Sequence, residues 1–142
     1  MAISADVLRS YRSIDEKVVD KLLAQEIKNN NKKIVVLDDD PTGVQTVHDI
    51  SVYTGWDADS LREAFAEENN LFYILTNSRG FTEDQTKAAH LEIADAVDKA
   101  AKEASRDYIF ISRSDSTLRG HYPLETRLLK ECYERNTGVK LD

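Results

Sequence analysis

The segment Ile34-Val35-Val36-Leu37-Asp38-Asp39-Asp40-Pro41-Thr42-Gly43 joins a short apolar run to an acidic turn. Its first four residues are apolar and mostly β-branched, which predicts a buried strand of the kind found in parallel sheets. The run ends in consecutive aspartates, and the proline and glycine that follow are typical of a turn. The segment therefore predicts a buried strand that carries polar side chains at its carboxyl end.

Strands and helices are predicted to alternate along the rest of the chain. Further strands are expected at residues 50–54, 71–75 and 108–111. Helices are expected at residues 57–65, at residues 82–104, and from residue 123 to residues 136–138. Their start signals are Asp57 as a cap, Thr82 with Gln85 as a capping box, and Pro123 as a first-turn residue. This alternation predicts an α/β fold with a doubly wound, mostly parallel sheet and flanking helices.

Residues 1–32 are predicted to form a helical arm that precedes a domain of residues 33–142. From Ser4 to Asn31 the chain reads as helical, and apolar side chains recur at helical spacing. These apolar positions are Val18, Val19, Leu22, Leu23 and Ile27. We expect this face to pack on the domain or on a partner subunit of a homo-oligomer. Because the sequence ends where a further strand would be expected, we also expect an incomplete fragment of a longer two-domain protein.

The composition is that of a globular protein. Its 142 residues suffice for one α/β domain, and a hydrophobic fraction of 41% argues against a disordered chain. A net charge of -7 disfavours binding to nucleic acid or to an anionic membrane surface. Cys132 is the only cysteine, so no internal disulfide can form, and the sequence has neither a membrane-length apolar run nor a signal-peptide core. We therefore expect a cytoplasmic protein.

Polar residues cluster directly after three of the predicted strands, at residues 38–43, 76–80 and 112–120. In an open parallel sheet the carboxyl ends of the strands share one edge, and ligands bind there. We therefore expect these three segments to form a single pocket, although they are far apart in the sequence.

The side chains in these segments are of two complementary kinds. The arginines, whose guanidinium groups suit a carboxylate or a phosphate, are Arg79, Arg113 and Arg119. The aspartates, which suit the hydroxyl groups of a sugar, are Asp39, Asp40 and Asp115. Arg113 alternates with its neighbours along a strand, so it points either into the pocket or away from it. The combination indicates a site for a polyhydroxy acid, with the arginines giving local positive charge in an acidic protein.

Three motifs in these segments resemble those of the four-carbon acid sugar kinase family. They are Asp-Asp-Asp-Pro-Thr-Gly, Thr-Asn-Ser-Arg and Ser-Arg-Ser-Asp-Ser-Thr-Leu-Arg-Gly-His. The resemblance is to the family's sugar-binding N-terminal domain and runs from about Lys33 to the end of the chain. It implies ATP-dependent phosphorylation of acids such as threonate, erythronate or their 3-oxo forms. It also implies that ATP and Mg²⁺ bind to a C-terminal nucleotide-binding domain, which we expect this chain to lack.

The resemblance assigns substrate contacts to particular residues. The first motif contributes Asp40, the second contributes Arg79, and the third contributes the segment from Asp115 to Arg119. With Asp39 from the same turn, the expected substrate-binding residues are Asp39, Asp40, Arg79, Asp115, Ser116, Thr117, Leu118 and Arg119. Either Asp40 or Asp115 could orient the reacting hydroxyl group. No residue is assigned as the catalytic base, and neither a nucleotide site nor a metal site is expected in this chain.

Two other interpretations fit part of the sequence. Asp38 and Asp40 follow an apolar strand with the spacing of the nucleophile and general acid of haloacid-dehalogenase-like, Mg²⁺-dependent phosphatases. That chemistry also needs a lysine and a further acidic pair at strand ends, which residues 112–117 do not offer. The other interpretation is a non-catalytic module for ligand binding or oligomerisation.

Overall fold

The computed structural model describes residues 4, 6, 7, 14–45 and 47–142. The chain divides into two compact units, one that ends at Asn31 and one that begins at Lys32. The predicted boundary between the helical arm and the domain lies one residue later, between residues 32 and 33, and the predicted domain organisation stays a prediction.

The N-terminal unit contains helix α1 (Glu16–Asn29). The carboxylate of Asp15 accepts hydrogen bonds from the backbone N–H groups of Lys17 and Val18, so the helix begins later than the predicted start at Ser4. Residues 5 and 8–13 of the predicted helix lie outside the described residues. The apolar side chains of α1 are about half exposed, and the packing partner expected for them stays a prediction, as does a homo-oligomer.

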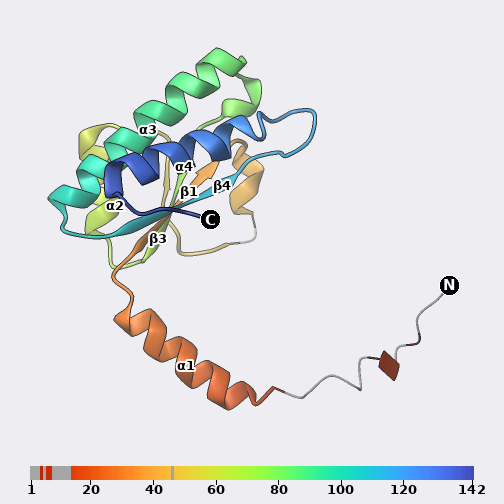
Figure 1. The fold of residues 1–142 in the computed structure, drawn as a ribbon. Coiled ribbons are helices and arrows are strands. Elements are labelled where there is room, and N and C mark those ends of the chain that lie inside the picture. The colour runs from red at the N-terminus through yellow and green to blue at the C-terminus, as the bar shows by residue number, and fades with distance from the viewer. Residues whose placement is uncertain (1–3, 5, 8–13, 46) are drawn as a thin grey trace. The chain divides into compact units, whose positions relative to one another are not determined.

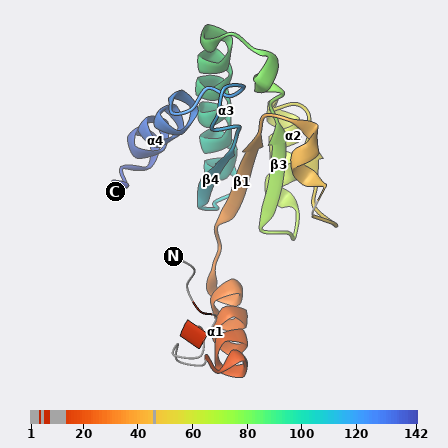
Figure 2. The ribbon, with the colours of Figure 1, turned by 90° about the vertical axis from the view of Figure 1, so that its right-hand side faces the viewer.

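The second unit contains a parallel sheet of four strands in the order β2-β3-β1-β4 (Figures 1 and 2). The strands are β1 (Lys33–Asp38), β2 (Val52–Tyr53), β3 (Leu71–Leu75) and β4 (Tyr108–Arg113). The predicted α/β class and parallel sheet are confirmed. Strand β1 lies between β3 and β4, which places its carboxyl end beside both of theirs.

The α-helices of this unit are α2 (Ala58–Ala66), α3 (Glu83–Glu103) and α4 (Leu124–Thr137). Helices α2 and α3 begin directly after the predicted caps. The carboxylate of Asp57 caps α2, and Thr82 and Gln85 form the reciprocal bonds of a capping box on α3. Pro123 lies one residue before α4 instead of inside its first turn. Gly138, with a φ of 76°, ends α4 in the left-handed conformation that favours glycine.

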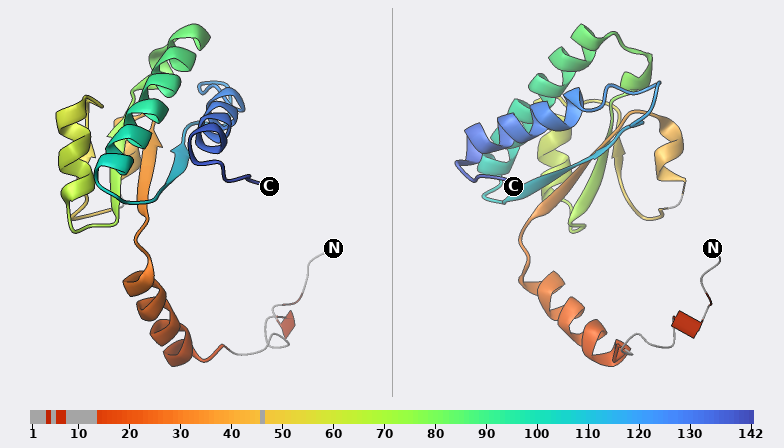
Figure 3. Two further views of the ribbon diagram at one scale, coloured as in Figure 1. Left: turned by 60° about the vertical axis from the view of Figure 1, so that its left-hand side comes forward. Right: turned by 45° about the vertical axis from the view of Figure 1, so that its right-hand side comes forward.

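One face of the sheet supplies the core (Figure 3). Val35 and Leu37 from β1 and Phe72 and Ile74 from β3 are fully buried, because alternate residues of a strand point to the same face. They pack in one cluster with apolar residues of α2, α3 and α4, including Leu61, Phe65, Ile93, Val97 and Leu129. This packing holds the carboxyl ends of β1, β3 and β4 in fixed positions.

Within the described ranges, none of the helices combines the length and the apolarity that crossing a lipid bilayer requires.

Candidate functional site

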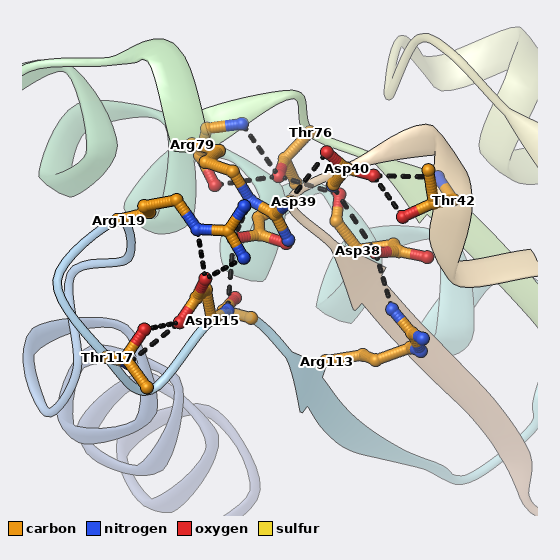
Figure 4. Close-up of polar contacts among 12 residues, drawn as sticks. Asp38, Asp39, Asp40, Thr42, Thr76, Arg79, Arg113, Asp115, Thr117 and Arg119 are labelled. Atoms are coloured by element: carbon orange, nitrogen blue, oxygen red, sulfur yellow. Dashed lines mark hydrogen bonds and ion pairs between the residues drawn. The ribbon is translucent and has the colours of Figure 1, made fainter.

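The loops that leave β1, β3 and β4 meet at the carboxyl edge of the sheet (Figure 4). The backbone N–H of Thr76, after β3, donates to the carbonyl oxygen of Asp38 at 2.8 Å. The backbone N–H of Asp115, after β4, donates to Oδ2 of Asp39 at 3.0 Å. These two bonds tie both flanking loops to the acidic turn, so the predicted convergence of the three segments is confirmed.

Arg79 joins the second loop to two aspartates of the acidic turn. Its Nη2 and Nε lie 2.9 Å and 3.3 Å from the two carboxylate oxygens of Asp39, and its Nη1 lies 2.8 Å from Oδ2 of Asp40. Asp39 is almost fully buried, whereas the Arg79 side chain keeps 25% of its surface exposed. The hydrogen bond with Asp39 raises the pKa of Arg79. The guanidinium group is therefore held in a fixed orientation at the solvent side of the pair.

Asp40 and Asp115 occupy equivalent positions in their two loops. Each accepts hydrogen bonds from the backbone N–H and the hydroxyl of the threonine two residues later, Thr42 or Thr117. These hydrogen bonds are the main cause of a lowered pKa at both aspartates, and ion pairing with arginine acts in the same direction. Both side chains are therefore ionised acceptors at neutral pH.

Arg119 pairs with Asp115 within the third loop. Its Nε and Nη2 each lie 2.8 Å from Oδ2 of Asp115, and 69% of its side chain is exposed. Figure 4 draws the Arg119 side chain next to that of Arg79, above Asp115. The two arginines thus offer neighbouring donors to a molecule that approaches from outside.

Asp38 and Arg113 form a third pair, on the opposite side of the acidic turn. The two residues are register partners in β1 and β4, and Nη1 of Arg113 lies 3.3 Å from Oδ1 of Asp38. Arg113 therefore points toward the cluster, which settles the question that its alternating position left open. Burial raises the pKa of Asp38, whose side chain is only 1% exposed.

Two glycines are required by close packing at this edge. A Cβ atom on Gly43 would lie 1.6 Å from Oδ2 of Asp38 and 2.4 Å from Nη1 of Arg113. A Cβ atom on Gly120 would lie 1.6 Å from the carbonyl oxygen of Asp115. All three distances are far below van der Waals contact, so a side chain at either position would displace the loop or its partners.

The comparison with protein families identifies the chain. The model of the sugar-binding N-terminal domain family matches residues 34–139. This chain belongs to that family. The match confirms the resemblance to the four-carbon acid sugar kinases, whose N-terminal domain this is. Neither the search of curated proteins nor the search of solved structures found a match.

Membership of the sugar-binding family does not support the phosphatase interpretation. That interpretation requires Asp38 to act as a nucleophile on a substrate. In this sugar-binding domain Asp38 is buried beneath Gly43 and paired with Arg113, so its carboxylate does not face solvent. The geometry at Asp38 is that of a structural ion pair.

The charge of the site differs from the expectation. Four carboxylates belong to the cluster, those of Asp38, Asp39, Asp40 and Asp115. Three guanidinium groups face them, those of Arg79, Arg113 and Arg119. The expected excess of positive charge is therefore wrong, because every arginine of the sugar-binding domain's cluster is already paired with an aspartate. An acidic ligand would have to share or replace these internal partners.

The remaining predicted residues lie at the tip of the third loop. Thr117 contacts Asp115, whereas Ser116 and Leu118 are on the exposed side of the loop. The Leu118 side chain is fully exposed. The role of these residues, and of the whole predicted set, in binding a substrate stays a prediction.

A hollow of about 340 Å³ adjoins the third loop and gives room for a small molecule. It is lined by Glu83, Gly120, His121, Tyr122, Pro123, Leu124 and Arg127. Among the described residues, no group of three or more histidine, cysteine or carboxylate side chains could hold a metal ion.

Sequence reasoning missed several residues that shape the site. Thr42, Gly43 and Gly120 lie inside the quoted motifs, and their role could have been inferred from the tight turns there. Ser78 and Glu125 form a buried hydrogen bond of 3.3 Å between the second loop and α4. The sequence gives no clear signal for this contact. The periodicity of α4 does not reveal that the Glu125 side chain is buried.

Proposed function

We propose that this domain binds a four-carbon sugar acid, such as threonate, erythronate or a 3-oxo form, for ATP-dependent phosphorylation by the complete protein. The proposal is supported by membership of a sugar-binding family that is associated with sugar kinases. The observation that carries it is the convergence of Arg79, Asp40 and Asp115 at one edge of the sheet. Guanidinium groups beside ionised carboxylates suit a ligand that has both an acid group and hydroxyl groups.

The two kinds of side chain would divide the ligand between them. The carboxylate of the acid would bind the guanidinium groups of Arg79 and Arg119, each of which has more N–H donors than its bonds to the internal aspartates use. The hydroxyl groups would donate to Asp40 and Asp115, which their lowered pKa values keep ionised. This arrangement would fix the substrate in one orientation, which is the main requirement for transferring a phosphoryl group to one hydroxyl.

ATP and Mg²⁺ are assigned to a separate nucleotide-binding domain. The sequence contains no Gly-x-x-x-x-Gly-Lys loop, and the described residues offer no cluster for a metal ion. The side chains described above do not fit either group, so their proposed role is limited to binding and orienting the acid. A single cysteine and a net charge of -7 support a cytoplasmic protein that does not bind nucleic acid.

Calorimetric titration of this chain tests the binding step. We expect threonate or erythronate to bind, and we expect threitol and erythritol, which have the hydroxyl groups but lack the acid, to bind much more weakly. Equal binding of acids and polyols, or no binding of any four-carbon acid, would contradict the proposal.

A second measurement tests the reaction. With a nucleotide-binding domain present, ADP should form from ATP only when a four-carbon acid is added. Hydrolysis of a generic phosphate ester with Mg²⁺, abolished by Asp38→Asn, would instead support the phosphatase interpretation.

A further inference from the structure

A buried polar network lies beneath the turn that carries Arg79. The turn η3 (Ser78–Gly80) follows β3, and Ser78 is its first residue. Ser78 is fully buried, and its hydroxyl donates to Oε1 of Glu125 at 3.3 Å. Glu125, in the first turn of α4, is 1% exposed. A buried carboxylate thus holds the residue directly before Arg79.

The same network continues to the acidic turn. The Thr76 hydroxyl lies 2.9 Å from the Ser78 hydroxyl and 3.0 Å from the carbonyl oxygen of Asp38. The backbone N–H of Arg79 donates to the carbonyl oxygen of Asp39. The turn is therefore fixed on one side by the acidic turn and on the other side by α4.

His90 supports Glu125 from α3. Its Nδ1 lies 2.9 Å from the carbonyl oxygen of Thr86, which can only accept, so Nδ1 carries a proton. Its Nε2 faces Oε1 of Glu125 at 3.6 Å. Burial lowers the pKa of His90, and the imidazole lies beside the carboxylate without a hydrogen bond between Nε2 and Oε1. His90 therefore packs against the Glu125 carboxylate on the side of α3.

This network is costly for a small domain. Buried ionisable groups need compensation that an apolar side chain of similar size would not need. In the described part of the chain, Oε2 of Glu125 and Nε2 of His90 are buried without a hydrogen-bond partner. An apolar residue at position 125 would fill the space at lower cost but could not hold the Ser78 hydroxyl. We therefore infer that the network contributes more to the position of the Ser78–Gly80 turn than to the stability of the domain.

We propose that Ser78 and Glu125 are positioning residues, which hold the Ser78–Gly80 turn so that the Arg79 guanidinium faces the ligand. The identity of that ligand, a sugar acid, rests on the function proposed above. The orientation of Arg79 does not rest on it and can be measured without a ligand.

Two variants break the network and two serve as controls. Ser78→Ala removes only the hydroxyl, and Glu125→Leu removes the carboxylate. Glu125→Gln is the conservative variant, because its amide oxygen can accept from the Ser78 hydroxyl in place of Oε1 of Glu125. Cys132→Ala is the second control, because it creates a cavity at a buried thiol two helical turns after Glu125 in α4 and leaves the network unchanged.

The first readout is the Nε–H signal of Arg79 in a ¹H–¹⁵N spectrum, assigned by its loss in Arg79→Lys. The second readout is the affinity for threonate. We expect Ser78→Ala and Glu125→Leu to shift or broaden the signal and to weaken binding about 10-fold or more, as a displaced guanidinium would. Glu125→Gln should restore both readouts. Cys132→Ala should lower the melting temperature and change neither.

The outcomes separate the inference from the proposed function. An unchanged Arg79 signal in folded Ser78→Ala overturns the positioning role, and so does an equal change in Cys132→Ala. If Glu125→Leu does not fold, Ser78→Ala and Glu125→Gln decide the matter. A displaced signal in a protein that never binds threonate or erythronate supports the positioning role and contradicts the function.

Discussion

Arg79 binds the carboxylate of Asp39 in a bidentate manner, with Nη2 2.9 Å from Oδ1 and Nε 3.3 Å from Oδ2. The same carboxylate accepts the backbone N–H of Asp115. One buried aspartate directly after β1 therefore organises both flanking loops, and the orientation of Arg79 depends on it.

Replacing Arg79 by alanine should weaken the binding of threonate or erythronate by roughly 10- to 100-fold, the range for losing a charge-assisted hydrogen bond. Arg79→Lys should restore little of the lost affinity, because an ammonium group cannot form the bidentate pair with a carboxylate. Titration calorimetry on the folded variants measures the effect. Arg62→Ala, at an exposed pair with Asp59 on α2, is the matched control. Affinity unchanged in Arg79→Ala would remove this side chain from the site.

Gly43→Ala should lower the free energy of unfolding by about 1–3 kcal/mol, since the added methyl group collides with Asp38 and Arg113. Urea denaturation gives the difference. The control is Gly80→Ala, where nothing lies within 4 Å of the added atom. Equal free energies of unfolding for the two variants would show that the Asp38 and Arg113 side chains can move aside without destabilising the fold.

Gly120→Ala should displace the third loop, because the added methyl group meets a backbone carbonyl oxygen that no side-chain rotation can move. We expect weaker sugar-acid binding, measured by calorimetry, since Arg119 and Asp115 lie in this loop. Gly55→Ala is the comparison, because its closest neighbour is a side-chain oxygen of Asp57 at 3.3 Å, and no backbone atom lies within 4 Å. Wild-type affinity in Gly120→Ala would argue that the loop does not contact the ligand.

Tyr108 should make the protein sensitive to alkaline pH. Burial, and then the neighbouring Asp98, raise its pKa above the ordinary value of 10.0. Its contribution to stability is therefore complete below about pH 10, where the unfolded chain also keeps the proton, and is lost as the pH rises further. The loss should approach about 1.4 kcal/mol per pH unit for this group.

Urea denaturation at several pH values above 9 measures this loss of stability. Tyr108→Phe should have a shallower dependence on pH than the wild type, because the groups that titrate elsewhere are common to both. Tyr122→Phe, at an exposed tyrosine, should follow the wild-type curve. Identical slopes for Tyr108→Phe and the wild type would refute the assignment.

Local signals made most of the fold predictable. Strand β3 was predicted at its observed bounds, and the capping box at Thr82 gave the start of α3. Strand β2 has two residues instead of the predicted five, because it pairs only with β3 at the edge of the sheet and propensity does not show how much of a strand finds a partner. The start of α1 was predicted too early because the prediction relied on the spacing of apolar residues and did not use Asp15 as a cap.

The site was predictable only at the level of segments. The rule for parallel sheets brings three loops together, but it does not say which arginine meets which aspartate. Arg113 contacts Asp38 because the register of β1 and β4 aligns them, and Ser78 meets Glu125 across 47 positions of sequence. Such pairings depend on distances across the fold that no local pattern contains.

The third loop runs as one continuous piece from the end of β4 to the start of α4, and a single backbone N–H anchors it to Asp39. Residues 114–120 could therefore be exchanged as a cassette for a loop of another length or charge, with the hydrophobic core left intact. The ligand preference of this domain could then be redesigned by grafting a new loop, provided that this loop keeps a backbone N–H that donates to the Asp39 carboxylate.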